Sequence, residues 1–241
     1  MAERFSGYRS VGIESPHAGR GAQKVRRAYD VPMLTEPQFF GFLLAAVLIT
    51  LAPGPDNLMV LGMGMARGRR QGIAFGLGCA SGCLSHTTLA VLGVSAVIAA
   101  SPLAFGLLRV VGGVYLLWLG IGAWRSRGAG PLQRAPGGAQ QPLLRLFARG
   151  VLANAVNPKV VLFFLSFLPQ FVVPAHGHVA AQMALLGLTF TLQAALLFGL
   201  IGAFSGSIGQ RLQRNPRLGQ WLDRIAGTVF VGLGLKLIAS R

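Results

Sequence analysis

The sequence predicts an all-α integral membrane protein with six transmembrane helices, arranged as two inverted three-helix repeats whose first and fourth helices are broken. Three observations predict this fold class. Apolar residues make up 53% of the 241 residues and charged residues only 12%, which is too apolar for an ordinary soluble domain. The 22 Lys and Arg residues, against 6 Asp and Glu, gather in short clusters between apolar segments. Prolines interrupt two of these segments at corresponding places.

The first 32 residues precede the first apolar segment and hold six basic side chains among glycines and serines. Residues 1–32 contain no apolar run that could pack or span, so we expect a disordered basic leader. The leader also lacks the apolar core of a secretory signal peptide. Because Met33 stands just before the first apolar segment, translation starting at Met33 is the alternative expectation.

Six apolar segments follow the leader, and each has roughly the length that spans a bilayer. They are about 37–66, 72–99, 103–124, 146–171, 179–205 and 218–239. Basic residues follow the first, third and fifth segments, whereas the second and fourth connections have no Lys or Arg. Cytoplasmic loops collect Lys and Arg, so we expect the odd-numbered connections inside and both termini outside. The same distribution favours a lipid bilayer over nucleic acid as the partner of the positive charge.

The connection 126–142 is rich in Gly, Pro and Gln, and we interpret it as a cytoplasmic linker. It divides the chain into a first repeat, 33–125, and a second repeat, 143–241. Three helices in each half place the two halves in opposite orientations. The third and sixth segments also match each other, with an Arg, a Gly, a Val and an aromatic residue at the same spacing.

The first apolar segment is interrupted by Pro53, Gly54 and Pro55, followed by Asp56 and Asn57. Proline has no backbone donor, so carbonyl groups upstream are freed, and we expect Asp56 and Asn57 to cap the half-helix that restarts downstream. Freed backbone groups at membrane depth are tolerated only inside protein or beside a water-filled cavity. A broken helix that holds a carboxylate therefore indicates a binding site for a transported solute.

The fourth segment contains a second interruption, which begins at Asn154. Pro158 suits the first position of a restarting helix and Asn157 suits its cap. Aligning the prolines of the two breaks sets Asp56 against Lys159. Transporters built from inverted repeats bind their substrates near the midplane, where broken helices meet.

These blocks resemble the LysE/RhtB family of bacterial amino-acid exporters, over about residues 33–241. The most specific element is the first break, which is similar to the family's T-P-G-P-D/N pattern but has Ala52 where threonine is common. Other matching pieces are the Gly-rich second segment from Gly72, the stretch Gly112-x-x-Tyr115-Leu116-x-x-Leu119-Gly120 and the block Asn154-x-x-Asn157-Pro158-Lys159. The resemblance implies a multi-pass exporter of amino acids in the bacterial inner (plasma) membrane, driven by proton antiport. It does not identify the solute.

The two charged residues of the breaks are the first candidates for the site. Asp56 would take the ammonium group of a substrate or a coupling proton, because an ionisable residue at membrane depth is costly unless it is paired or wet. Lys159 would take a substrate carboxylate, or Asp56 itself when the site is empty, with snorkelling to an interface as its alternative. We expect Asn57, Asn154 and Asn157 to act chiefly as backbone caps, with substrate contact as a second role.

His86 and Gln193 lie at similar places in the second and fifth segments, where each either faces the cavity or bonds to a neighbouring helix. His86 could also handle protons, since histidine changes charge near neutral pH. Cys79 and Cys83 share one helix face and are interpreted as small core residues. We expect no metal site and no cofactor, because two thiols have too few further ligands beside them.

Two other classes of function compete with export of an amino acid. A membrane-embedded enzyme would need a cluster of acids, histidines or a nucleophile at one depth, and Asp56 and His86 are too sparse for that. Export of another small solute or of a metal cation on the same architecture is the nearer alternative, although a cation site gathers several ligands. The sequence leaves open whether two copies pair as a homodimer.

Overall fold

Every regular element in the described part of the chain, residues 33–94, 96, 101–126 and 140–239 of this computed structural model, is a helix. The helices are α2 (Glu36–Leu51), α3 (Pro55–Arg67), α4 (Arg69–Leu89), η1 (Ala90–Val94), α6 (Pro102–Arg125), α7 (Leu143–Ala155), α8 (Pro158–Leu162), η2 (Phe163–Phe167), η3 (Leu168–Phe171), η4 (Pro174–His176), α9 (Val179–Ala203), α10 (Ser205–Arg214) and α11 (Pro216–Ala239). The predicted leader and most of the predicted linker lie outside the described residues. The described helices belong to one unit, Leu34–Arg241.

The two predicted helix breaks are confirmed. α2 and α3 meet at a bend of 55°, and α7 meets the helical run Pro158–Phe171 at a bend of 53°. A proline occupies the first turn of the helix that restarts at each break, where its missing N–H has no partner to lose. Each bent pair has the length and composition to cross a membrane as one unit.

Three unbroken helices are also long and apolar enough to cross a membrane, namely Arg69–Gly93, Leu103–Arg125 and Val179–Ala203. With the two bent pairs, the described residues therefore hold up to five spans by length and composition. The sixth predicted segment forms α11, which has 24 residues. Asp223, Arg224 and Lys236 lie along α11, and it is not among the spans recognised by composition in the described chain.

α10 is a helix that the sequence did not predict. The residues between the fifth and sixth apolar segments were interpreted only as a basic connection, yet Ser205–Arg214 continue as a separate helix after a turn at Phe204. Apolar Ile208 and Leu212 alternate with basic Arg211 and Arg214 along it. Its basic residues were interpreted only as a sign of a cytoplasmic connection. The amphipathic spacing of its apolar residues, which is typical of a helix, was therefore overlooked.

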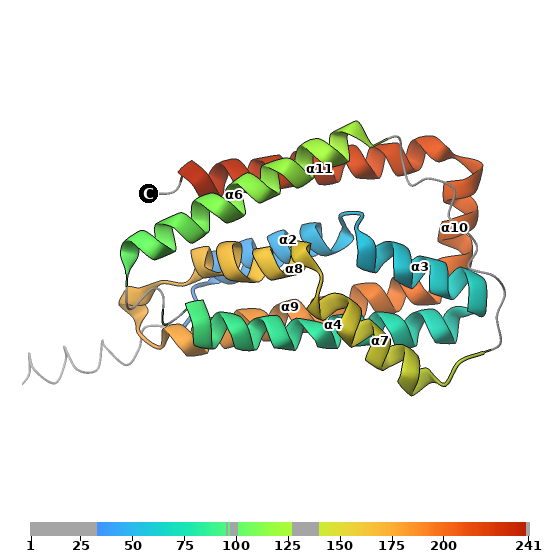
Figure 1. The fold of residues 1–241 in the computed structure, drawn as a ribbon, viewed down its shortest axis with the longest axis horizontal. Helices are drawn as coiled ribbons and strands as arrows, with labels where there is room; N and C mark the ends of the chain where they lie inside the picture. The colour runs from blue at the N-terminus through green and yellow to red at the C-terminus, as the bar shows by residue number, and fades with distance from the viewer. Residues whose placement is uncertain (1–32, 95, 97–100, 127–139, 240–241) are drawn as a thin grey trace, which may run out of the picture. The chain divides into compact units, whose positions relative to one another are not determined.

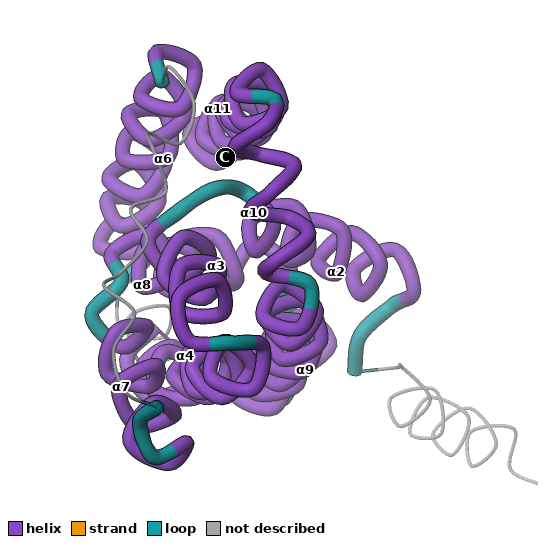
Figure 2. The backbone as a smooth tube through the Cα atoms, turned by 90° about the vertical axis from the view of Figure 1, so that its right-hand side faces the viewer, coloured by secondary structure: helices purple, strands orange, loops and turns teal. Residues whose placement is uncertain are grey.

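The helices are arranged as two groups with the broken pairs between them. α6 packs along α11 on one side, and α4 packs along both α7 and α9 on the other. α2, α3 and α8 lie between these groups in both views (Figures 1 and 2). Figure 1 shows both breaks near the middle of the length of α4 and α9. The breaks are therefore surrounded by helices, as freed backbone groups in a membrane require.

A cluster of buried aromatic rings fills the space beside the breaks. Phe163, Phe164 and Phe167 come from the π-helical turn η2, Phe42 comes from α2 and Phe190 comes from α9. The ring centroids of Phe164 and Phe190 are 4.9 Å apart, and those of Phe163 and Phe190 are 5.2 Å apart. Replacing one such ring by alanine costs about 3 to 5 kcal/mol, so this cluster fixes α2, η2 and α9 around the site.

Candidate functional site

The two breaks face each other across a small cavity of about 20 Å³, which polar and apolar side chains line together. It is lined by Ile49, Thr50, Asp56, Asn57, Cys83, Asn154, Asn157, Lys159, Val160, Phe163, Phe190 and Phe198. About 10 to 15 Å³ suffices for one water molecule, whereas small-molecule pockets enclose about 300 to 1,000 Å³. In this conformation the cavity therefore has room for about one water molecule.

Asp56 lies in the first turn of α3 and is 3% exposed. Its Oδ2 accepts a hydrogen bond of 2.7 Å from Asn154 Nδ2, across the cavity from α7. The expectation that Asp56 caps α3 is wrong, because the N-cap residue is Gly54 and no side chain bonds to that end. Through Asn154, the carboxylate instead joins the two broken pairs.

Lys159 is 8% exposed at the start of α8. Its Nζ donates a 2.7 Å hydrogen bond to the carbonyl of Ala52, the last residue before the prolines of the first break. The same ammonium group lies 5.5 Å from the centre of the Phe230 ring. No ion pair joins Lys159 to Asp56, so the pairing expected for the empty site is not formed in this arrangement. Lys159 instead satisfies a carbonyl that the first break frees.

The sequence predicts that Asn57 caps the half-helix downstream, and this prediction is wrong. Its Nδ2 reaches back to the end of α2 and donates to the carbonyls of Thr50 at 2.8 Å and Leu51 at 3.4 Å. An asparagine placed after a break can use its amide as a donor as well as an acceptor. Here the unsatisfied groups are the carbonyls of the preceding helix, so the donor side is used.

Asn157 caps α8 as predicted, since its Oδ1 accepts from Lys159 N at 3.0 Å. Asn154 has a different role from the predicted cap. Its side chain donates to Asp56 and accepts from the thiol of Cys83 at 3.5 Å, while its backbone oxygen lies 3.0 Å from His86 Nε2. Asn154 is fully buried and connects α3, α4 and α7 at one point.

His86 and Gln193 stand behind the cavity rather than in its lining. His86 contacts the backbone oxygen of Asn154, and because a carbonyl only accepts, Nε2 carries the proton. Gln193 Nε2 donates 2.9 Å to Thr50 Oγ1. The remaining polar atoms, His86 Nδ1 and Gln193 Oε1, are buried without a hydrogen-bond partner. Each residue thus connects the unbroken helix of one half to a broken pair of the other.

Thr50 and Cys83 are site residues that sequence reasoning missed. Thr50 precedes the prolines by several residues in an apolar run, and Cys83 was interpreted with Cys79 as packing. Cys79 is fully buried, whereas Cys83 lines the cavity and touches Asn154. Cys83 could have been found from its spacing, because it lies three residues before His86 and so shares a helix face with it. No group of three or more His, Cys, Asp or Glu side chains suited to a metal ion occurs among the described residues.

The arrangement places one carboxylate and one ammonium group in the same cavity, each with a neutral partner. Asp56 is held by an amide, and Lys159 is held by a backbone carbonyl. Neither partner cancels the charge it binds, so each charged group keeps the capacity to bind an ion of opposite sign. A cavity of this kind can receive a molecule that has a positive and a negative end.

Comparison with known proteins gives the chain a family. The family described as LysE type translocator matches residues 47–241. An uncharacterized membrane protein of Vibrio cholerae is 32% identical over 204 residues, which cover 84% of this chain and 97% of the relative. The homoserine/homoserine lactone efflux protein of Salmonella typhimurium is 28% identical over 86% of this chain and 99% of its own length. The leucine efflux protein of Enterobacter sp. is 30% identical over 83% of this chain and 94% of its own length. No solved structure matches the chain.

Proposed function

We propose that this chain, which belongs to the LysE type translocator family, exports amino acids or close derivatives through the cavity between its two broken helix pairs. The family consists of translocators, so the chain is a transporter and not an enzyme, and it is a multi-pass membrane protein. Relatives that align over nearly their whole length are named for efflux of homoserine, homoserine lactone and leucine. These solutes share an α-amino group, and the first and third are zwitterions.

The single observation that favours this function is the pair Asp56 and Lys159 in one cavity. A substrate ammonium group would replace the Asn154 amide at Asp56, and a substrate carboxylate would draw Lys159 away from the Ala52 carbonyl. Both exchanges substitute a charged partner for a neutral one, and charge-assisted hydrogen bonds are the stronger kind. Binding therefore breaks the two contacts that hold the broken pairs together across the cavity.

The closed cavity supports a transport cycle in which the site opens and closes. Its volume of about 20 Å³ is too small for an amino acid, so the substrate enters only when the broken pairs move apart. A ligand shifts a conformational equilibrium by its differential affinity for the two states. Here the differential contacts are those of Asp56 and Lys159, which bind the substrate in the open state and protein groups in the closed one.

The full architecture proposed for this cycle has six spans in two inverted three-helix repeats, with α11 as the sixth span. Equivalent elements of the two halves occupy matching surroundings: α4 packs against α9, and α6 packs against α11. His86 of the first half bonds to Asn154 of the second, and Gln193 of the second half bonds to Thr50 of the first. Such reciprocal contacts are expected when a pseudo-two-fold axis runs between the repeats.

Proton antiport is the proposed driving force, with Asp56 as the group that exchanges a proton for the substrate ammonium. Asp56 is the buried carboxylate of the cavity, and an intramembrane carboxylate is by default a functional group. A carboxyl that releases its proton on binding an ammonium group cannot hold both at once. That exclusivity links the movement of one proton to the movement of one substrate molecule.

The test is efflux from vesicles that contain the purified protein and are loaded with homoserine, leucine or threonine. We expect at least one of these amino acids to leave faster when the outside of the vesicle is more acidic than the inside, so that protons enter as the amino acid leaves. Asp56→Asn should abolish the acceleration by the gradient, while Glu36→Gln, which changes an exposed carboxylate on α2, should leave it unchanged. Efflux that is absent for every amino acid tested, or that ignores the gradient, contradicts the proposal.

A further inference from the structure

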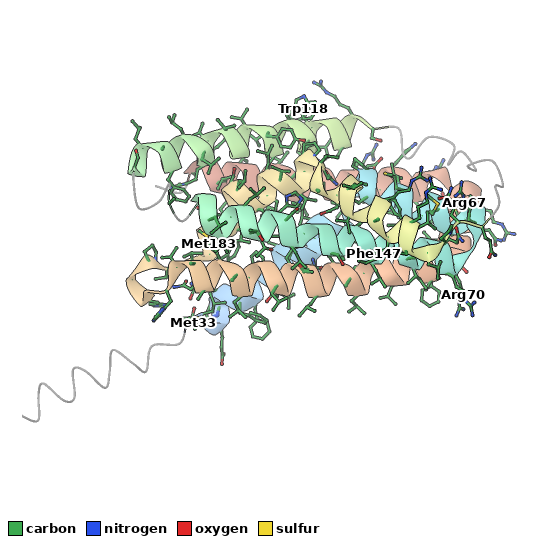
Figure 3. The ribbon with its side chains drawn as sticks, turned by 60° about the horizontal axis from the view of Figure 1, so that its bottom comes forward. Met33, Arg67, Arg70, Trp118, Phe147 and Met183 are labelled. Carbon is green, nitrogen blue, oxygen red and sulfur yellow. The ribbon has the colours of Figure 1, made fainter. Side chains whose placement is uncertain are left out.

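A second cleft lies between the α3–α4 turn and the start of α7, separate from the central cavity. Its volume is about 580 Å³. It is lined by Arg67, Gly68, Arg69, Arg70, Gln71, Gln140, Gln141, Pro142 and Leu143. Figure 3 shows Arg67 and Arg70 together at one end of the helices. None of the lining residues named takes part in the transport site.

The charge of this cleft has one sign. Arg67, Arg69 and Arg70 line it, and no carboxylate is among the described residues of its lining. Two helices also begin there: α4 after Gly68 and α7 after Pro142, and neither end has a side-chain cap. The first turns of helices expose backbone N–H groups with partial positive charge. The cleft therefore combines three full positive charges with two uncapped helix ends.

The polar groups around the arginines are already paired with each other. Gln71 Nε2 donates to the Gln141 carbonyl at 2.9 Å, and Gln141 N donates to Gln71 Oε1 at 3.3 Å. Gln141 Oε1 accepts from Arg149 Nη1 at 3.1 Å. These bonds hold the α4 and α7 sides of the cleft in place and engage the side-chain oxygens of Gln71 and Gln141.

Arg67 is the unsatisfied group of the cleft. Its side chain is partly exposed, but its Nε and Nη1 are buried and have no hydrogen-bond partner within the described protein. A buried donor of a charged group without an acceptor is costly, and native proteins seldom leave one. An anionic acceptor would satisfy these donors best, because hydrogen bonds between groups of opposite charge are the stronger kind. This observation points to a ligand independently of the helix ends and of the overall charge.

We propose that this cleft binds a phosphate group, held by the guanidinium of Arg67 and by the charges of Arg69 and Arg70. Arginine suits phosphate because its planar set of N–H donors matches the phosphate oxygens. Uncapped helix N-termini favour the same ligand. The phosphate belongs either to a soluble anion or to the headgroup of an anionic lipid, and both sources present the same oxygens to the three arginines.

The site would couple to the rest of the molecule through the helices that form it. α3 runs from the cleft to Asp56 at its other end, and α7 runs from the cleft to Asn154. Those two residues are hydrogen-bonded to each other at the central cavity. A bound phosphate therefore braces, at their outer ends, the two half-helices that meet at the transport site.

Thermal unfolding of the purified protein in detergent tests the proposal. The probes are inorganic phosphate, compared with sodium chloride at equal ionic strength, and short-chain phosphatidic acid, compared with short-chain phosphatidylcholine. We expect a rise in the unfolding temperature on the order of 3 °C with at least one phosphate probe. A response to inorganic phosphate identifies a soluble anion, and a response to phosphatidic acid alone identifies a lipid headgroup.

Variants decide whether the shift comes from this cleft. Arg67→Gln should remove most of the shift, and Arg70→Gln, which changes an exposed side chain that cannot disturb packing, should reduce it. Arg217→Gln is the matched control, since Arg217 is exposed and does not line the cleft. No shift with either probe in the unsubstituted protein overturns the proposal. A shift that survives both Arg67→Gln and Arg70→Gln, or that is lost equally in Arg217→Gln, overturns it as well.

Discussion

The two helix breaks have nearly the same bend but different chemistry. The second break is closed by its own residues: Asn157 Oδ1 caps α8, and Asn157 N donates 2.8 Å to Asn154 O. The first break has no cap at Gly54, and its freed carbonyls are satisfied by Asn57 and by Lys159, which arrives from the second break. The first break therefore depends on the second, whereas the second is self-contained.

This difference explains how binding could move one part of the molecule and leave another fixed. A break completed by its own cap keeps its geometry whatever occupies the cavity. A break completed by a distant ammonium group, as Lys159 completes the first break, would lose that support if a substrate carboxylate took the ammonium group. We infer that α2 and α3 change their angle during transport while the α7–α8 junction serves as the fixed reference.

Removing Lys159 should produce the largest effect and tests the dependence directly. Lys159→Met keeps the length of the side chain but leaves the buried Ala52 carbonyl without its donor and Asp56 without a nearby cation. We expect export to fall to background and the free energy of unfolding to fall by about 1 to 3 kcal/mol. Efflux assays and denaturation in detergent measure the two effects. Lys236→Met, which changes an exposed side chain of α11, is the control: losing its contact with the Phe171 ring should cost at most about 1 kcal/mol, and export should be unchanged.

Combining substitutions at both charges should separate stability from transport. Asp56→Asn alone leaves Lys159 as an uncompensated buried charge, whereas Asp56→Asn with Lys159→Gln leaves no charge in the cavity. We therefore expect the double variant to be more stable than the sum of the two single losses implies, by about 0.5 to 3 kcal/mol. Export driven by the pH gradient should be absent in Asp56→Asn, in Lys159→Gln and in the double variant. Additive losses of stability would mean that Asp56 and Lys159 do not interact.

Much of the architecture was predictable because it depends on local chemistry. The breaks follow from Pro53, Pro55 and Pro158, and the cap at Asn157 follows from its place just before a proline. The bounds of the long helices also match the apolar segments closely, since hydrophobic length is set by the bilayer. These features need only the sequence within a few residues of each position.

The hydrogen-bond partners of the site residues were not predictable from the same sequence. Asn57 turned back to α2, Asn154 joined Asp56, and Lys159 took a backbone carbonyl instead of a carboxylate. Each choice depends on which unsatisfied group lies nearest after the two halves have packed, and the residue type leaves donor and acceptor roles open. The contacts of Asn154 and Lys159 join residues 98 and 107 positions apart, whereas the contact of Asn57 spans only 7 positions.

The two asparagines next to the breaks offer a matched pair of moderate effect. Asn57→Ala removes the donor to the Thr50 carbonyl, which is partly buried, and should cost about 1 to 2 kcal/mol. Asn157→Ala removes one cap but leaves Pro158 and the backbone bonds of the second break, and should cost about 1 kcal/mol. Export rates should fall more for Asn57→Ala. Equal losses in both variants would remove the distinction between a dependent and a self-contained break.

Gly54→Ala is expected to have the smallest effect. The backbone of Gly54 is extended, so alanine is permitted there, but its Cβ would lie 3.1 Å from Lys159 Nζ. The flexible ammonium group can move by a few tenths of an ångström, at some cost to its bond with Ala52. We expect about a twofold decrease in export rate, which corresponds to about 0.4 kcal/mol. Gly62→Ala, on the same helix with open space around it, should leave the rate unchanged.

The central claim is that the exported amino acid occupies the cavity between the breaks and is held there by Asp56. Cys83 lines that cavity and is fully buried, so a reagent reaches its thiol only when the cavity opens, and a bound amino acid in the open cavity would block the reagent. In a Cys79→Ala background, we would measure the rate at which a small methanethiosulfonate reagent labels Cys83, with and without the exported amino acid. The account predicts that a saturating concentration slows labelling strongly, and that Asp56→Asn abolishes this protection while labelling itself continues. Labelling at an unchanged rate, in protein that still exports the same amino acid, would contradict the account.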